Sequence, residues 1–108
     1  MTANDFDFLR SKLERVVYFA FVDIRNLSRM GAMDQIQDLA DVAELIPEYL
    51  ARRREEDLLA IRGGLEAYAA KYDGMSSRLL QILDMDEAMF NDLFPTERLT
   101  ATRLAASA

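Results

Sequence analysis

Carboxylates are the only abundant side chains in this chain that could support catalysis or bind metal, because it contains no Cys and no His. The chain therefore has no thiol or imidazole nucleophile and no ligands for structural zinc or a carboxylate di-iron bundle. Asp84, Asp86 and Glu87 have spacing that could open a calcium loop, which needs Gly at its sixth position and an acid at its twelfth. Those positions hold Met89 and Pro95. We interpret the three acids as helix caps and expect no metal, no cofactor and no enzyme activity.

Asp23 is the one acid placed on an apolar helical seam, at helical steps from Ala20 and Leu27. A buried carboxylate must be paired, because an isolated charge is costly to remove from water. We expect an ion pair with an arginine of another helix, and Arg62 is one candidate. The alternative is that Asp23 faces a partner.

A strip of acids lies between Ala32 and Leu50, where the chain has five acids and no base: Asp34, Asp38, Asp41, Glu44 and Glu48. If the segment is one helix, these acids lie away from its apolar stripe, with two apolar residues within or beside them. Carboxylates around an apolar contact suit recognition of a basic protein, because charge steers association and apolar contact holds the complex. The predicted partner-binding residues are Asp38, Asp41, Val42, Leu45 and Glu48. Two alternatives stay open: another helix covers this side, or it is simply solvated.

The basic run Arg52–Arg54 could bind phosphate or RNA, but the acidic run Glu55–Asp57 follows it and cancels its field beyond about 10 Å. We interpret it as a solvated turn. A net charge of −6 and a pI near 4.6 repel nucleic acid and anionic lipid, so neither is an expected partner. The longest uncharged apolar run, Val16–Val22, is too short to span a membrane, and the first residues are acidic where a secretory signal is basic. We expect a cytoplasmic protein.

The elements that must position these residues are helices, because only two prolines and four glycines interrupt 108 residues. The first is predicted from a cap at Asn4 to Met30, with Gly31 ending it. Its seam has helical spacing and contains Phe6, Leu9, Leu13, Val16, Ala20, Leu27 and Met30. Its middle is apolar all round, so we expect it to be central in a bundle or buried by a second copy through Tyr18, Phe19 and Phe21.

A second helix is predicted from a capping-box-like start at Asp34 and Gln37 to just before Pro47, which opens a short segment reaching Leu50. Its inward stripe is Ile36, Leu39, Ala40, Ala43 and Ile46. A third helix follows the acidic run, with the seam Leu58, Ile61, Leu65, Tyr68 and Tyr72. The pair Gly63–Gly64 in its middle predicts a kink or a close approach of another backbone. Lys71 and Gly74 mark its end.

A fourth helix is predicted over 78–83, capped by Ser76 or Ser77, and a further turn over 88–94, capped by Asp84 or Asp86. The predicted fold is an all-α compact bundle of four to five helices with a long first helix. Residues 1–95 form its single domain, and residues 96–108 are a frayed or weakly helical tail.

Several packing motifs resemble those of small uncharacterised bacterial all-helical proteins. They are Ile24-Arg25-x-Leu27, Gln35-Ile36-x-Asp38-Leu39-Ala40-Asp41, Ile46-Pro47 and Leu65-x-x-Tyr68-x-x-Lys71-Tyr72. Members of that group commonly carry His and Asn after the second motif, where this chain has Val42–Leu45, so no role of that His carries over. The chain is also similar in type to the immunity proteins that neutralise secreted toxins.

These features favour a small acidic protein-binding protein, an immunity- or antitoxin-type inhibitor of a basic toxin or nuclease domain. The alternative is a helical homo-oligomeric adaptor or structural protein with no toxin partner, joined as a homodimer through the first helix.

Overall fold

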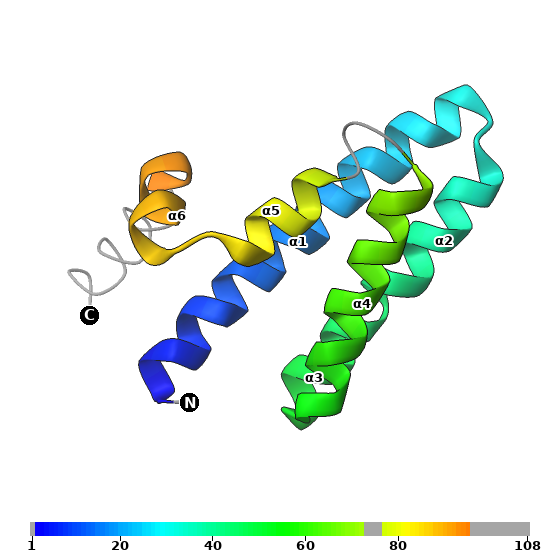
Figure 1. Cartoon of the computed structure of the whole chain (residues 1–108). Coiled ribbons are helices and arrows are strands. Elements are labelled where there is room, and N and C mark those ends of the chain that lie inside the picture. The colour runs from blue at the N-terminus through cyan, green and yellow to red at the C-terminus, as the bar shows by residue number, and fades with distance from the viewer. Residues whose placement is uncertain (1, 73–76, 96–108) are drawn as a thin grey trace.

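The computed structural model describes residues 2–72 and 77–95, and for Ser77 only its place in a helix. Every regular element in these ranges is a helix (Figure 1). The helices are α1 (Ala3–Met30), α2 (Met33–Ala43), α3 (Leu45–Arg52), α4 (Glu55–Lys71), α5 (Ser77–Asp84) and α6 (Glu87–Leu93). None of those described helices combines the length and apolar character that crossing a bilayer requires. The predicted all-α fold with a long first helix is confirmed, whereas the tail after Thr96 lies outside the described residues.

The two ends of α1 are fixed by local chemistry. The Thr2 hydroxyl accepts a hydrogen bond from the Asp5 backbone N–H, and the Asp5 carboxylate accepts one from the Thr2 backbone N–H. This capping box satisfies two N–H groups that the helix cannot pair, so the cap is Thr2 and the predicted cap at Asn4 is wrong. Gly31 ends the helix with φ of 73°, a left-handed conformation that glycine adopts without strain, as predicted.

The chain between α1 and α4 differs from the prediction. The N-cap of α2 is Ala32, which makes no side-chain hydrogen bond, so the predicted cap at Asp34 is wrong. The helix breaks at Glu44, and α3 starts at Leu45 rather than at Pro47. Pro47 lies within the first turn of α3, where backbone N–H groups have no helical partner and a missing one costs little.

The later helices follow their sequence signals. The seam of α4 is confirmed: Ile61, Leu65 and Tyr68 are buried, and the helix continues through its two glycines. Asp86 caps α6, because its carboxylate accepts a 2.8 Å hydrogen bond from the Met89 N–H. The predicted cap of α5 at Ser76 or Ser77 and the predicted end of α4 at Gly74 lie outside what the structure describes.

Five helices form a bundle with four antiparallel legs, because α2 and α3 follow each other along one leg. The ribbon runs up along α1, down along α2 and α3, up along α4 and down along α5 (Figure 1). Both α2 and α5 contact α1 and α4, so α1 and α4 are bridged by the other two helices. The largest fully buried side chains lie between these helices and are Leu13, Val16, Leu39, Ile46, Ile61, Leu65, Leu79 and Ile82.

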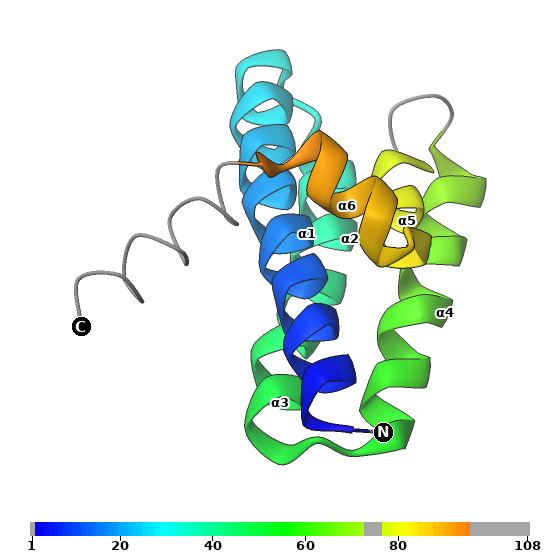
Figure 2. The same cartoon turned by 90° about the vertical axis from the view of Figure 1, so that its left-hand side faces the viewer.

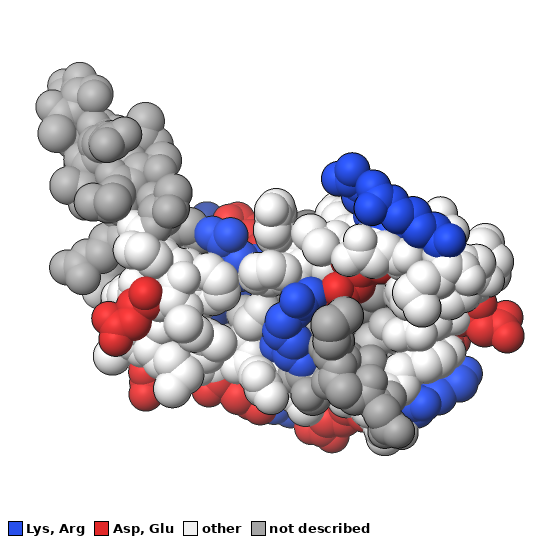
Figure 3. All heavy atoms as spheres, turned by 90° about the horizontal axis from the view of Figure 1, so that it is seen from above, with Lys and Arg blue, Asp and Glu red and all other residues white. Residues whose placement is uncertain are grey.

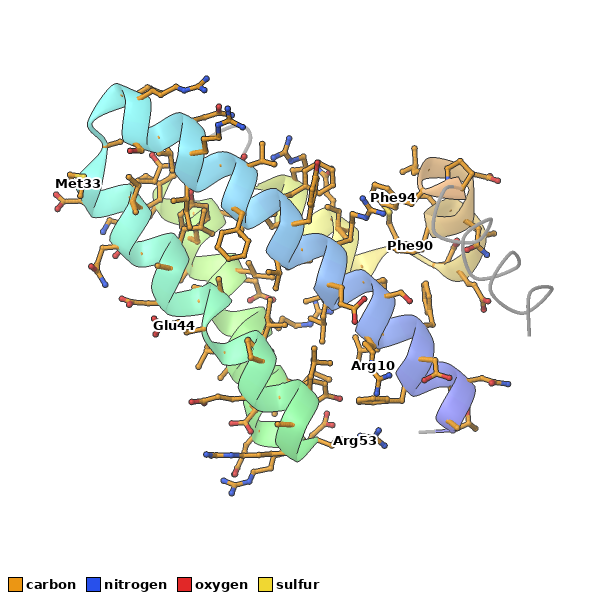
Figure 4. The ribbon with its side chains drawn as sticks, turned by 180° about the vertical axis from the view of Figure 1, so that it is seen from behind. Arg10, Met33, Glu44, Arg53, Phe90 and Phe94 are labelled. Atoms are coloured by element: carbon orange, nitrogen blue, oxygen red, sulfur yellow. The ribbon has the colours of Figure 1, made fainter. Side chains whose placement is uncertain are left out.

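The short helix α6 lies across the α1 side of the bundle (Figure 2). Its aromatic residues Phe90 and Phe94 face α1 (Figure 4). The ring of Phe90 lies 5.7 Å from Phe8, and that of Phe94 lies 6.1 Å from Phe19. The Arg15 guanidinium lies 4.7 Å from the Phe94 ring. Aromatic and cation–π contacts therefore join α6 to the bundle.

The apolar middle of α1 is not buried on all sides. Val16 and Ala20 are in the core, Phe19 is half-buried, and Tyr18 and Phe21 are exposed. The expectation that this segment is central in the bundle is wrong, because α2, α3 and α5 cover only one side of α1. Met30, predicted in the seam, is also exposed at the end of the helix.

Candidate functional site: the groove between α2 and α4

A groove of about 300 Å³ lies between α2 and α4. Its lining comes from both helices and consists of Asp38, Asp41, Val42, Gly64, Ala67, Tyr68 and Lys71. Three of the five predicted partner-binding residues, Asp38, Asp41 and Val42, are therefore brought together here.

Small residues of α4 shape this groove. A Cβ atom added to Gly64 would lie 3.0 Å from the nearest methyl carbon of Val42, so the two helices approach each other closely at this point. One turn further along α4, Ala67 also has a short side chain, which leaves space above it. A close approach is found at Gly64, but it is made by the Val42 side chain and not by a backbone as predicted, whereas Gly63 has open space around it.

Asp38 forms a polar cluster with the end of α4. The same oxygen, Oδ2, accepts hydrogen bonds from Lys71 Nζ at 2.7 Å and from the Tyr72 hydroxyl at 2.5 Å. Donation from Lys71 and Tyr72 lowers the pKa of Asp38, and the bond to Asp38 raises the pKa of both Lys71 and Tyr72. The Asp38 carboxylate is thus largely neutralised by groups of its own chain.

The other polar groups at the groove are bonded differently. The Tyr68 hydroxyl accepts a 2.9 Å hydrogen bond from Gln35 Nε2, which satisfies a buried ring at its polar end. Asp41 Oδ1 accepts one from Gln37 Nε2 at 3.0 Å. Within residues 2–72 and 77–95, no Lys or Arg forms an ion pair with Asp41. Asp41 is therefore the exposed, uncompensated acid of the groove.

The apolar part of the predicted surface is not exposed. Val42 has only 9% of its surface accessible, and Leu45 is half-buried against the core. The alternative that another helix covers this side is confirmed for Val42, which still lines the groove, whereas the predicted role of both residues in partner binding stays a prediction. The reason is that α2 packs against α1 on one side and against α4 on the other, so it buries a wider face than one stripe.

The remaining acids of the strip are exposed outside the groove. Asp34 lies in the first turn of α2, and Glu48 in the first turn of α3. Glu44 occupies the break between the two helices and points away from the bundle (Figure 4). Seen from above, by contrast, acidic and basic side chains alternate with uncharged surface (Figure 3). The strip of acids on α2 and α3, which contains no base, therefore differs in charge from that face.

Neither partner of Asp38 is a predicted site residue: Lys71 lines the groove, and Tyr72 lies outside its lining but bonds Asp38. Tyr72 was assigned to the core seam of α4, and Lys71 to its C-terminal turn. Their spacing from Tyr68 puts them at the end of α4, but only the pairing of α4 with α2 brings them to Asp38. Gly64 is the one signal in the sequence that pointed to this pairing.

Asp23 is paired, but not with Arg62. Only 7% of Asp23 is exposed, and its Oδ1 lies 2.6 Å from the guanidinium of Arg78 on α5. Arg62 instead lies 2.6 Å from Asp84. Burial raises the pKa of Asp23, and Arg78 opposes that rise. The predicted buried ion pair is confirmed, and the predicted candidate partner is wrong, because α5 rather than α4 packs beside this part of α1.

The run Arg52–Arg54 is exposed, as predicted: Arg52 ends α3, and Arg53 and Arg54 connect it to α4. Arg53 has φ of 57°, and its guanidinium lies 3.8 Å from the centre of the Phe6 ring. Arg10 approaches the same ring from α1, at 5.0 Å (Figure 4). These arginines pack against an aromatic ring of the bundle, and the left-handed backbone of Arg53 caps the end of α3, where its N–H donates to the Tyr49 carbonyl.

Among the described residues, no group of three or more acidic side chains is arranged to hold a metal ion. No family model, no curated protein and no solved structure matches this chain. The α2–α4 groove is therefore interpreted from its own chemistry.

Proposed function

We propose that this chain is a small protein-binding protein that neutralises a basic toxin or nuclease domain by direct contact, and that the α2–α4 groove receives a lysine or arginine of that partner. The observation that carries the proposal is an apolar groove with an uncompensated acid, Asp41, at its edge.

The groove matches the two parts of a long basic side chain. Val42, Gly64 and Ala67 offer apolar surface for the aliphatic stem of a lysine or arginine. Asp41 lies where the charged head would emerge, and it needs a cation more than Asp38 does, because Lys71 already pairs with Asp38. A charge-assisted hydrogen bond to Asp41 would be the specific polar contact.

The exposed acids beside the groove add a second contribution. Asp34, Glu44 and Glu48 share the base-free stretch with Asp41, and none of them forms an ion pair within the part of the chain described. Such a surface accelerates association with a basic partner and contributes less to the lifetime of the complex. The groove and the acids thus have separable roles in binding.

The experiment is a biosensor titration against the product of the adjacent gene, which the proposal expects to be a basic protein. Asp41→Lys should slow association at low salt, and the difference should shrink at high salt. Ala67→Leu fills the groove from an exposed position and should speed dissociation at least tenfold, which corresponds to about 1.4 kcal/mol.

Glu66→Lys is the matched control, because Glu66 is an exposed acid of α4 that does not line the groove. It should leave both rates near those of the wild type. Wild-type binding by both Asp41→Lys and Ala67→Leu would overturn the groove as the binding site. Unimpaired toxicity of the neighbouring product when this chain is co-expressed would overturn the inhibitor role.

A further inference from the structure

The outward face of α1 carries a regular row of residues that no other helix within residues 2–72 and 77–95 buries. The row follows three- and four-residue steps and contains Ser11, Glu14, Tyr18, Phe21, Arg25 and Ser28. Its two aromatic residues are 56% and 67% exposed, although large aromatic side chains are normally well buried. This row lies on the opposite side of α1 from Leu13, Val16 and Ala20, which are in the core.

The spacing of the row is that of a helix-pairing seam. Alternating three- and four-residue steps place one residue after another along a narrow line that faces a partner helix. The centre of this row is aromatic, its next positions are charged, and its ends are small serines. Val17 and Val22, which are partly buried, lie beside the centre and widen its apolar part.

The charges of the row make it complementary to itself in one orientation. The acid Glu14 lies on the N-terminal side of the aromatic pair, and the base Arg25 lies the same number of residues beyond it. An antiparallel copy therefore meets this row with opposite charges, whereas a parallel copy would place Arg25 against Arg25.

We propose that α1 pairs with α1 of a second copy, antiparallel and around a two-fold axis between Phe19 and Ala20. In this register Tyr18 of each chain packs on Phe21 of the other, and Glu14 faces Arg25. At both ends of the seam, Ser11 faces Ser28, so the close approach of the helices is not blocked there.

Moving the register by one heptad in either direction loses these matches. One shift brings Glu14 against Tyr18, and the other brings Phe21 against Arg25. Only the central register pairs the aromatics with each other and both acids with bases. The seam is a single helix face, so the contact belongs to the small, reversible class of interfaces.

Sedimentation of the full chain at low salt tests the charge pairing. Glu14→Arg and Arg25→Glu should each weaken self-association at least tenfold, because each variant brings like charges together. An equimolar mixture of the two variants should associate almost as tightly as the wild type, since each mixed pair contains two opposite-charge contacts. Glu66→Arg, a charge reversal on exposed α4, is the control and should dimerise normally.

Disulfide trapping tests the register, because the chain has no cysteine of its own. A mixture of the Ser11→Cys and Ser28→Cys variants should form a crosslinked pair under mild oxidation. Ser11→Cys alone should not, because two copies of residue 11 lie about 25 Å apart along an antiparallel pair. None of the four substituted residues, Ser11, Glu14, Arg25 and Ser28, is buried, so circular dichroism of each variant should show unchanged helix content.

A wild-type chain that stays monomeric up to about 1 mM, where even a weak pairing of about 4 kcal/mol would populate dimers, would overturn the pairing. Dimers of both single charge variants as tight as those of the wild type would also overturn it. These outcomes leave the groove proposal untouched, because no residue of the α1 row lines the groove.

Discussion

At the scale of single residues, burial and ion pairing shift the pKa of Asp23 in opposite directions. Burial raises the pKa of Asp23 above the ordinary 3.8, and the nearby guanidinium of Arg78 lowers the rise without cancelling it. Folding therefore disfavours the charged form of this carboxyl relative to the unfolded chain, although Arg78 still pairs with it. The stability that follows from a raised pKa is present below pH 3.8 and is lost as pH rises through the folded pKa.

Asp23→Asn should reveal the cost of burying a charged carboxylate, because the amide is neutral at every pH. The amide can still accept a hydrogen bond from Arg78. The free energy of unfolding of Asp23→Asn, relative to that of the wild type, should rise between pH 3.5 and pH 7. Urea melts at both values measure the difference. A relative stability that falls over this range would show that the ion pair outweighs desolvation.

Removing the acceptor altogether has a different consequence. Asp23→Ala leaves the Arg78 guanidinium without its carboxylate, and loss of one partner of a buried hydrogen bond costs about 1–3 kcal/mol. The Arg78 side chain is 37% exposed and packs on Phe19, so water can replace part of the interaction. We expect a value at the lower end of that range, whereas Asp34→Ala, at an exposed site without a capping bond, should cost little.

The cluster of Asp38, Lys71 and Tyr72 tests whether α2 and α4 meet as described. Lys71→Met should raise the pKa of Asp38 toward its ordinary value, because Lys71 is the largest cause of the lowered pKa. Tyr72→Phe should raise it as well. Carboxyl-carbon NMR titrations measure both effects.

Asp5 is an internal control in the same spectra. Its pKa is lowered by hydrogen bonds from Thr2 at the start of α1, and neither variant touches them. An Asp38 pKa that stays low in both variants would contradict the cluster. Because a lowered pKa contributes stability above pH 3.8 that is lost as pH falls, the variants should be less sensitive to acid than the wild type.

At the scale of elements, the two adjacent glycines of α4 should respond differently to the same substitution. Gly63→Ala should stabilise the protein by about 0.5–1 kcal/mol, because its new methyl group meets nothing within 4 Å and alanine favours a helix. Gly64→Ala should lose that gain, because its methyl group would lie 3.0 and 3.2 Å from the two methyl carbons of Val42.

Urea melts of the two variants form a matched pair, since both carry the same change in helix propensity. The free energy of unfolding should be higher for Gly63→Ala than for Gly64→Ala. Equal stabilisation by both would show that α4 does not approach α2 at this point.

Most helices could be predicted from the sequence, because their signals are local. Gly31 and Asp86 act within one turn of the residues they cap, and the seam of α4 appears directly as helical spacing. The faces of α2 could not be predicted in the same way. They depend on two neighbours at once, so Val42 was assigned to the surface although α4 covers it.

The candidate site shows the same division between local and long-range information. The acids of α2 and α3 are visible in the sequence because they are neighbours along the chain. Lys71, Tyr72 and Arg78 come from distant positions, and their pairing with Asp38 and Asp23 is decided by which helices adjoin. Residue type predicted that Asp23 needs an arginine, but only the order of helices in the bundle selects Arg78.

At the scale of the whole molecule, the two proposed surfaces use different residues of the bundle. The self-association row belongs to α1, and the groove belongs to α2 and α4. Since both α2 and α5 bridge α1 and α4, the core can remain intact when either surface is changed. A dimer through α1 would therefore present two grooves to a basic partner.

This arrangement predicts that dimerisation changes apparent affinity only when the basic partner is multivalent. Phe21→Asp introduces a charge at the centre of the α1 row and should keep the chain monomeric. On a surface densely coated with the basic partner, its dissociation should be at least tenfold faster than that of the wild type, because a dimer held at one groove rebinds through the other. In solution, a monovalent partner should bind both proteins equally.

Two results would contradict this arrangement. If the wild type is a dimer but dissociates from the dense surface as fast as Phe21→Asp, the two grooves cannot be occupied together. If Phe21→Asp binds the monovalent partner more weakly than the wild type does, the α1 row and the groove are coupled through the core.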